Sequence, residues 1–171
     1  MFSWLRRRSR SGRTATELYG SIVAAARREQ FYVAQSVPDT PDGRFAMVIA
    51  HMHLAMERLR AEGDAGQELN RALLEAFVID MDDSMREMGV GDLGVPRRVK
   101  KAAGALYDCV RVFRAAETPD ALAEALAHTI LVDEASPAAV PVAAYMTKAA
   151  KALAEQPGAE LLQGRISFPD P

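Results

Sequence analysis

Acidic side chains cluster in one short stretch of the sequence, and their spacing is the first feature that could support chemistry. Asp80, Asp83 and Glu87 recur at helical spacing, so they fall on one face of a predicted helix, with Asp82 between them. Carboxylates on one face can bind a hard cation such as Mg²⁺ or Ca²⁺. The stretch has neither the Glu-x-x-His pair of a carboxylate di-iron site nor the loop spacing of an EF-hand. We therefore predict no metal site and no bound cofactor.

The other reactive side chains do not form a recognisable catalytic motif. His51 and His53 lie two residues apart, which places them on different faces of a helix, unlike the i, i+4 pair of a zinc protease. Cys109, the single cysteine, lies in a helical pattern and is expected to be a small buried residue. The sequence has no P-loop, no Gly-x-Ser-x-Gly elbow and no Cys–His cluster. We predict that the protein is not an enzyme and has no catalytic residues.

A basic cluster follows the acidic one across a glycine-rich break at residues 89–94. The break separates a predicted helix that ends in acidic residues from one that begins with Arg97, Arg98, Lys100 and Lys101. Helices favour the opposite arrangement, because the N-terminus carries a partial positive charge and the C-terminus a partial negative one. We call residues 80–101 the charged corner. Two interpretations are open: the two helix ends neutralise each other, or the corner is a docking surface.

The docking interpretation assigns a set of candidate partner-binding residues. Met88 belongs to it because it ends the helix and because methionine adapts to irregular partners. The full set is Asp80, Asp82, Asp83, Arg86, Glu87, Met88, Asp92, Arg97, Lys100 and Lys101.

The N-terminal residues 1–13 are predicted to be a basic tail. They contain five arginines and no acid, with Phe2, Trp4 and Leu5 ahead of the arginines. An apolar tip with a basic cluster suits an anionic membrane surface or a ribosome. A plain solubilising tail and a short organelle transit peptide are the two alternatives.

Composition limits the class of protein further. The chain has 171 residues and a formal net charge of −2, which points to no specific nucleic-acid partner. A single cysteine leaves no internal disulfide framework. The sequence has no apolar run of the ~18–20 residues that a spanning helix needs. The protein is therefore expected on the synthesis side of the membrane. In a bacterium this is the cytoplasm, where the basic tail would allow peripheral contact with the inner face of the membrane.

Hydrophobic periodicity predicts an all-α single domain of six to seven helices. The stripe of apolar residues over 44–61 is the broadest, so this helix is expected to be central. A capping box at Thr14 predicts that the first helix starts at Ala15. The helical domain is expected to cover 14–163 and to be followed by a loose tail over 164–171.

One run of the sequence resembles a known family. Residues 77–93 read FVIDMDDSMREMGVGDL, and this run resembles the ubiquinol–cytochrome c chaperone family. Further matching positions lie between residues 18 and 113, at Leu18-Tyr19, Pro38-Asp39-Thr40, Asp42-Gly43-Arg44-Phe45, Val99-Lys100 and Tyr107.

The resemblance implies an assembly chaperone for ubiquinol–cytochrome c reductase. Such a protein binds newly made cytochrome b, or another subunit of the complex, by protein–protein contact and without catalysis. If the protein were eukaryotic, the resemblance would place it on the matrix side of the mitochondrial membrane. The rival hypothesis from the residues is a helical enzyme or small-ligand carrier whose interhelical pocket is lined by Asp80 and Asp83. A third hypothesis is a helical adaptor protein that is unrelated to this family.

Overall fold

The computed structural model describes the backbone of residues 2–131, 133 and 135–171, and the side chains of these residues from Ser11 onward. Helices connected by short loops make up the described chain, and this part contains no strand. Six of the helical segments are longer than ten residues, and α2 and α8 have four residues each. The segments are α1 (Phe2–Ala26), α2 (Gln30–Val33), α3 (Pro41–Arg60), α4 (Gly63–Glu87), α5 (Val95–Ala115), α6 (Pro119–Thr129), α7 (Ala139–Glu155) and α8 (Gly158–Leu161). The predicted all-α fold is confirmed.

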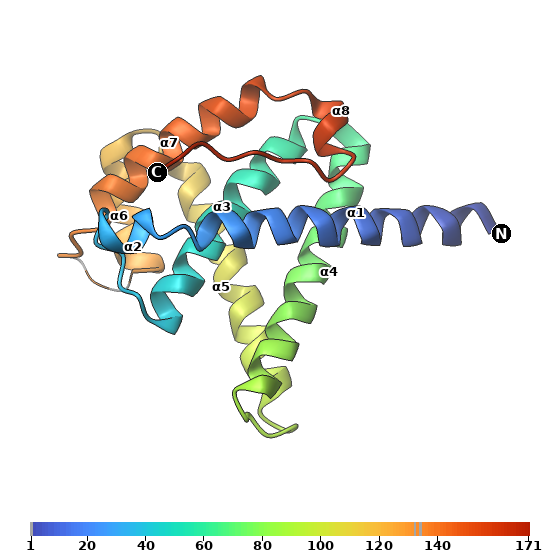
Figure 1. The fold of residues 1–171 in the computed structure, drawn as a ribbon, viewed down its shortest axis with the longest axis horizontal. Helices are drawn as coiled ribbons and strands as arrows, with labels where there is room; N and C mark the ends of the chain where they lie inside the picture. Colours follow the sequence, from blue (N-terminus) through green and yellow to red (C-terminus); the bar gives the residue numbers. More distant parts are fainter. Residues whose placement is uncertain (1, 132, 134) are drawn as a thin grey trace.

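Helix α3 forms the centre of the domain, as its broad apolar stripe predicted. It packs against α1, α4, α5 and α7 (Figure 1). Ten successive residues, 46–55, are buried on all sides of the helix. The helix starts at Pro41, three residues before the predicted start at Arg44. The Thr40 side chain caps it by accepting a hydrogen bond of 3.1 Å from the Gly43 backbone N–H, and proline suits the first turn because its missing N–H would have no partner there.

Helix α1 corrects the predicted helix start at Ala15. It begins at Phe2 and includes Thr14, so the capping box does not mark a boundary. Residues 2–13 contain no proline that would break the helix, and the Ser11 hydroxyl donates a hydrogen bond of 3.0 Å to Glu68 on α4. In Figure 1 the N-terminal part of α1 extends beyond the other helices. The side chains of residues 1–10, on which the tail interpretations depend, lie outside the described part of the chain.

The C-terminal residues 164–171 correct the prediction of a loose tail. They form no helix, but they run along α1 toward α7 (Figure 1). Phe168 is buried against the ring of His51, with the ring centroids 4.9 Å apart. Arg28 donates hydrogen bonds to the carbonyl oxygens of Phe168 and Pro169.

Two further side chains bind the same segment. The Gln156 side chain donates a hydrogen bond to the Ser167 carbonyl and accepts one from the Ser167 N–H. The Lys148 ammonium donates to the Asp170 carbonyl. Together with the buried ring of Phe168, these contacts hold the segment in place, and none of them gives a periodic sequence signal.

Helices α4 and α5 form an antiparallel hairpin whose turn projects away from the other helices (Figure 1). The fully buried residues of α4 are Gly66, Leu69, Leu73 and Phe77, and none lies beyond Phe77. Gly89 ends the helix with a φ of 77°, the left-handed conformation that favours glycine. The charged corner therefore lies at the end of the hairpin, beyond the last residue of α4 that is buried in the core.

Candidate docking surface

The acidic side of the charged corner is partly tied to its surroundings. Asp80 is half-buried and accepts a hydrogen bond of 2.8 Å from the Tyr19 hydroxyl on α1. Arg86 donates to Asp82 at 2.6 Å and to Asp92 in the following loop, also at 2.6 Å. These contacts raise the pKa of the Arg86 guanidinium, Asp82 being the larger cause. Arg86 therefore joins the end of α4 to the glycine-rich loop.

The other charges of the corner are exposed and have no ion-pair partner among the described residues. On α4 these are Asp83 and Glu87. On α5 they are Arg97, Arg98, Lys100 and Lys101. No ion pair between described residues joins an acidic side chain of α4 to a basic one of α5. The two helix ends therefore lie side by side without an ion pair between their described residues, and the choice between neutralisation and docking stays a prediction.

Large apolar side chains are exposed beside these charges. Met88, at the end of α4, is 63% exposed, and Leu93, at the turn, is 99% exposed. Ile79 on α4 and Tyr107 on α5 are also exposed. Covering these side chains would be favourable, because apolar surface is stabilised by removal from water. Exposed apolar side chains next to unpaired charges are typical of a contact surface for another macromolecule.

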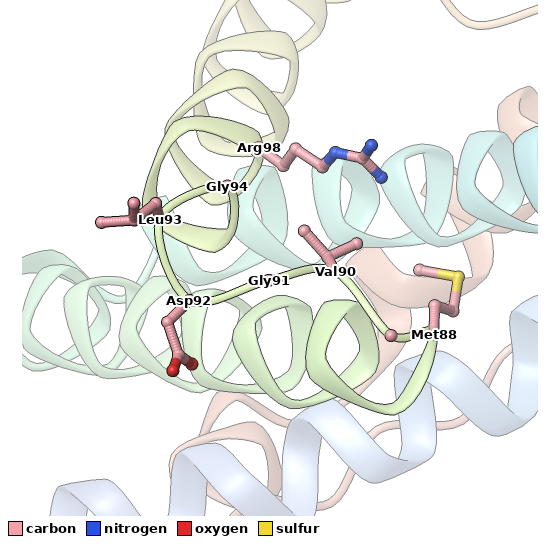
Figure 2. Close-up of a pocket in the computed structure, with 8 residues that line it drawn as sticks. Met88, Val90, Gly91, Asp92, Leu93, Gly94 and Arg98 are labelled. Carbon is pink, nitrogen blue, oxygen red and sulfur yellow. The ribbon is translucent and has the colours of Figure 1, made fainter.

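The turn encloses an open hollow of about 640 Å³. Figure 2 shows that the side chains of Val90 and Arg98 lie on the same side of the turn as Met88, whereas Leu93 points to the opposite side. The residues that border the hollow are Met88, Gly89, Val90, Gly91, Asp92, Leu93, Gly94 and Arg98. The hollow is broad and mostly backbone and apolar, so it suits a side chain of a partner protein better than a reacting substrate.

The carboxylates Asp80 and Asp83 line neither the hollow at the turn nor a smaller one of about 140 Å³ between α1 and α4, beside Leu162. Within the described chain, no three His, Cys, Asp or Glu side chains gather as they would around a metal ion. The arrangement lacks the converging polar groups that a carboxylate-lined pocket would need.

Both histidines of α3 are buried core residues. The Nδ1–H of His51 donates to the Met47 carbonyl at 2.8 Å, so its Nε2 accepts from the Tyr145 hydroxyl at 2.9 Å. Burial lowers the pKa of His51 to about 4 and that of His53 to about 4. Cys109 is buried, and burial raises the pKa of its thiol. The prediction that these residues are structural agrees with their burial.

Two features of this surface were missed by the sequence analysis. One is the Tyr19 hydroxyl, whose contact with Asp80 crosses from α1 to α4. The other is the exposure of Ile79 and Leu93. Ile79 could have been found, because it falls on the same side of the helix as Asp82 and Arg86, where an apolar residue is unexpected.

In the described residues, no helix is long and apolar enough to cross a membrane.

Comparisons with known proteins agree with the family resemblance of residues 77–93. The model of the ubiquinol-cytochrome C chaperone family matches residues 34–168. The crystal structure of the Cbp3 homolog from Brucella abortus is 37% identical, covers 99% of this chain and 96% of that one, and superposes with a TM-score of 0.83. Ubiquinol-cytochrome c reductase complex assembly factor 1 of Mus musculus is 28% identical over 76 residues, which are 44% of this chain.

The chain matches about a quarter (26%) of the length of the mouse protein. The family match, by contrast, extends over most of the chain and includes the charged corner, α3 and the C-terminal segment as far as Phe168. The fold-level match to the Brucella protein covers nearly all of both chains. On this basis, the chain belongs to the ubiquinol–cytochrome c chaperone family.

Proposed function

We propose that this protein is an assembly chaperone for ubiquinol–cytochrome c reductase that binds newly made cytochrome b by surface contact, without catalysis. The observation that carries the proposal is the charged corner. It lies on a projecting hairpin and offers unpaired charges of both signs beside the exposed Met88 and Leu93. Membership of the ubiquinol–cytochrome c chaperone family and similarity to the mouse reductase assembly factor support ubiquinol–cytochrome c reductase as the complex that is assembled.

The physical properties of the corner suit a transient chaperone. Exposed charges such as Lys100 and Lys101 speed and orient the encounter with a partner more than they strengthen the final complex. Leu93 and Met88 supply apolar area that a partner can cover, which stabilises by about 25 cal/mol per Å² of buried apolar surface. Because the apolar area is small, the client is held reversibly and can be passed on to the growing complex.

We place this activity in the cytoplasm of a bacterium, at the inner face of the membrane where cytochrome b is inserted. In a mitochondrion the equivalent place is the matrix side. The five arginines of residues 1–13 would hold the protein near an anionic membrane or a ribosome. At high salt this attraction weakens, because the charges are screened.

A deletion strain tests the function. Cells that lack the protein are expected to lose ubiquinol–cytochrome c reductase activity and to regain it when the wild-type chain is supplied. Two variants of the corner are supplied in parallel: an acid-side variant, Asp83→Lys with Glu87→Lys, and a base-side variant, Lys100→Glu with Lys101→Glu. Both are expected to restore activity poorly.

The matched control reverses two exposed charges far from the corner, Arg71→Glu with Lys151→Glu. Neither residue has an ion-pair partner among the described residues, so this variant is expected to restore activity fully. Normal reductase assembly in the deletion strain would contradict the proposed function. Full restoration by both corner variants would contradict the role of the charged corner.

A further inference from the structure

The charged corner is electrically balanced but largely unpaired. Residues 80–101 contain five acidic and five basic side chains. Arg86 is the one basic residue of the corner that pairs with carboxylates in the described chain. The acidic Asp83 and Glu87 and the four basic residues of α5 are exposed without such a partner.

A partner of uniform charge does not fit this surface. A nucleic acid or an anionic membrane would attract the basic side of α5 and repel the acidic side of α4. Asp92 adds a further negative charge next to the most exposed apolar residue, Leu93. The surface needs a partner that carries both signs.

A second copy of the same hairpin has the required pattern. Asp83 and Glu87 lie within about the last two turns of α4, and Lys100 and Lys101 within about the first two turns of α5. Since α4 and α5 are antiparallel and joined by a short turn, the last turns of α4 lie beside the first turns of α5 (Figure 1). When a second copy is turned by 180° about an axis that lies outside the hairpin and parallel to it, α4 of each copy faces α5 of the other, so an acidic cluster meets a basic one twice in the same interface.

We propose that the charged corner is a self-association surface on which a second copy of this chain docks with twofold symmetry. A twofold interface uses the same patch on both copies, so one patch must complement itself in charge. The corner meets this condition, because its acidic and basic clusters come from different helices. The dimer also covers apolar surface that the monomer leaves in water, such as that of Met88. The proposal goes beyond client binding and does not depend on it.

Sedimentation velocity of the purified full chain over a dilution series tests the proposal. At about 10 mM salt, where screening reaches about 30 Å, the wild-type protein is expected to dimerise as its concentration rises. At about 1 M salt, where screening acts within about 3 Å, the dimer is expected to dissociate. The acid-side and base-side variants are each expected to weaken self-association about tenfold or more, because like charges then face each other.

Mixing the two variants is the decisive step. Each variant has lost one cluster, and together they again present acidic against basic clusters at both contacts. The mixture is expected to form a heterodimer, and one chain that carries all four reversals is expected to dimerise like the wild type. The control variant, Arg71→Glu with Lys151→Glu, is expected to self-associate normally.

Three results would overturn the proposal: a wild-type protein that stays monomeric at low salt, a dimer that both variants leave unchanged, or two variants that fail to associate when mixed. The assay contains no client, so its failure leaves the proposed chaperone function untouched. A variant that keeps the dimer but loses client binding would bear on the chaperone function and leave the self-association proposal untouched.

Discussion

The Tyr19 hydroxyl on α1 donates a hydrogen bond of 2.8 Å to the carboxylate of Asp80 on α4, which lies 61 residues further along the chain. Tyr19 is buried, and its ring packs edge-on against Phe77, one helical turn before Asp80. The contact therefore fixes α1 to α4 at the point where the buried part of α4 ends. Burial and the nearby carboxylate raise the pKa of the Tyr19 hydroxyl, so it stays protonated and remains a donor.

Tyr19→Phe is expected to destabilise the protein by about 1–3 kcal/mol, because it leaves the half-buried Asp80 carboxylate without its donor. Urea denaturation followed by circular dichroism measures the change. Asp80→Asn and the double variant complete a cycle. The account requires the two single changes to be non-additive, and a coupling energy near zero would contradict it.

Acid is expected to destabilise the fold through His51 and His53. The folded protein keeps both rings neutral, since burial lowers each pKa from 6.5 to about 4. The unfolded chain takes up protons below about pH 6.5, so stability is full above that pH and is lost as the pH falls toward about 4. At pH 5 each histidine should cost about 2 kcal/mol relative to neutral pH.

A single variant separates the two histidines. His53 has a buried Nδ1 without a hydrogen-bond partner among the described residues, and its ring packs on Phe113. His53→Leu removes both the unpaired nitrogen and the titrating group. Urea denaturation at pH 7.5 and pH 5 should show that this variant loses about half as much stability on acidification as the wild type. If the variant lost as much stability on acidification as the wild type, the assignment of this loss to His53 would be contradicted.

The C-terminal segment is expected to contribute to stability through one residue. Phe168→Ala should cost about 3 kcal/mol, because it empties a buried site next to His51. Asp170 is the control. Its side chain is 93% exposed and pairs with Arg28, so Asp170→Ala should cost less than about 1 kcal/mol. Equal effects of the two changes in thermal or urea unfolding would show that Phe168 does not anchor the segment.

Charge reversal in the corner is expected to leave folding stability intact. Glu87 is the last residue of α4 and has no ion-pair partner in the described structure. Glu87→Lys places a positive charge at a helix C-terminus and should stabilise by about 0.3–1 kcal/mol. A thermal melt checks the direction. A lower melting temperature would favour the interpretation that the two clusters neutralise each other inside one chain.

Some of the fold was predictable from the sequence because the signals are local. The broad apolar stripe of α3 predicted its central position, and the glycines after Met88 predicted the end of α4. Thr118 and Pro119 are a local signal of the same kind, because the Thr118 side chain caps α6 and Pro119 is its first residue. Such features depend on neighbouring residues in the chain, so they can be recognised without knowledge of tertiary contacts.

The rest could not be predicted because it depends on distant contacts. The capping pattern at Thr14 is satisfied within a continuous helix, which is held to α4 by Ser11 and Glu68. The burial of Phe168 depends on a site built by α3 and α7. Likewise, the composition of the charged corner was evident from the sequence, but not which of its charges are paired. Arg86 reaches Asp92, whereas Lys100 pairs with no acid of the described chain, and both facts depend on how the turn folds.

The central claim is that the charged corner docks cytochrome b, and co-purification of cytochrome b with the tagged protein from membranes tests it most directly. The wild type, the acid-side variant, the base-side variant and the chain with all four reversals are compared at matched thermal stability. Each two-residue variant is expected to lose most of the cytochrome b. The four-reversal chain is expected to stay equally depleted, because the charges of the client are unchanged. Undiminished co-purification with both variants, or its full return in the four-reversal chain, would contradict the account.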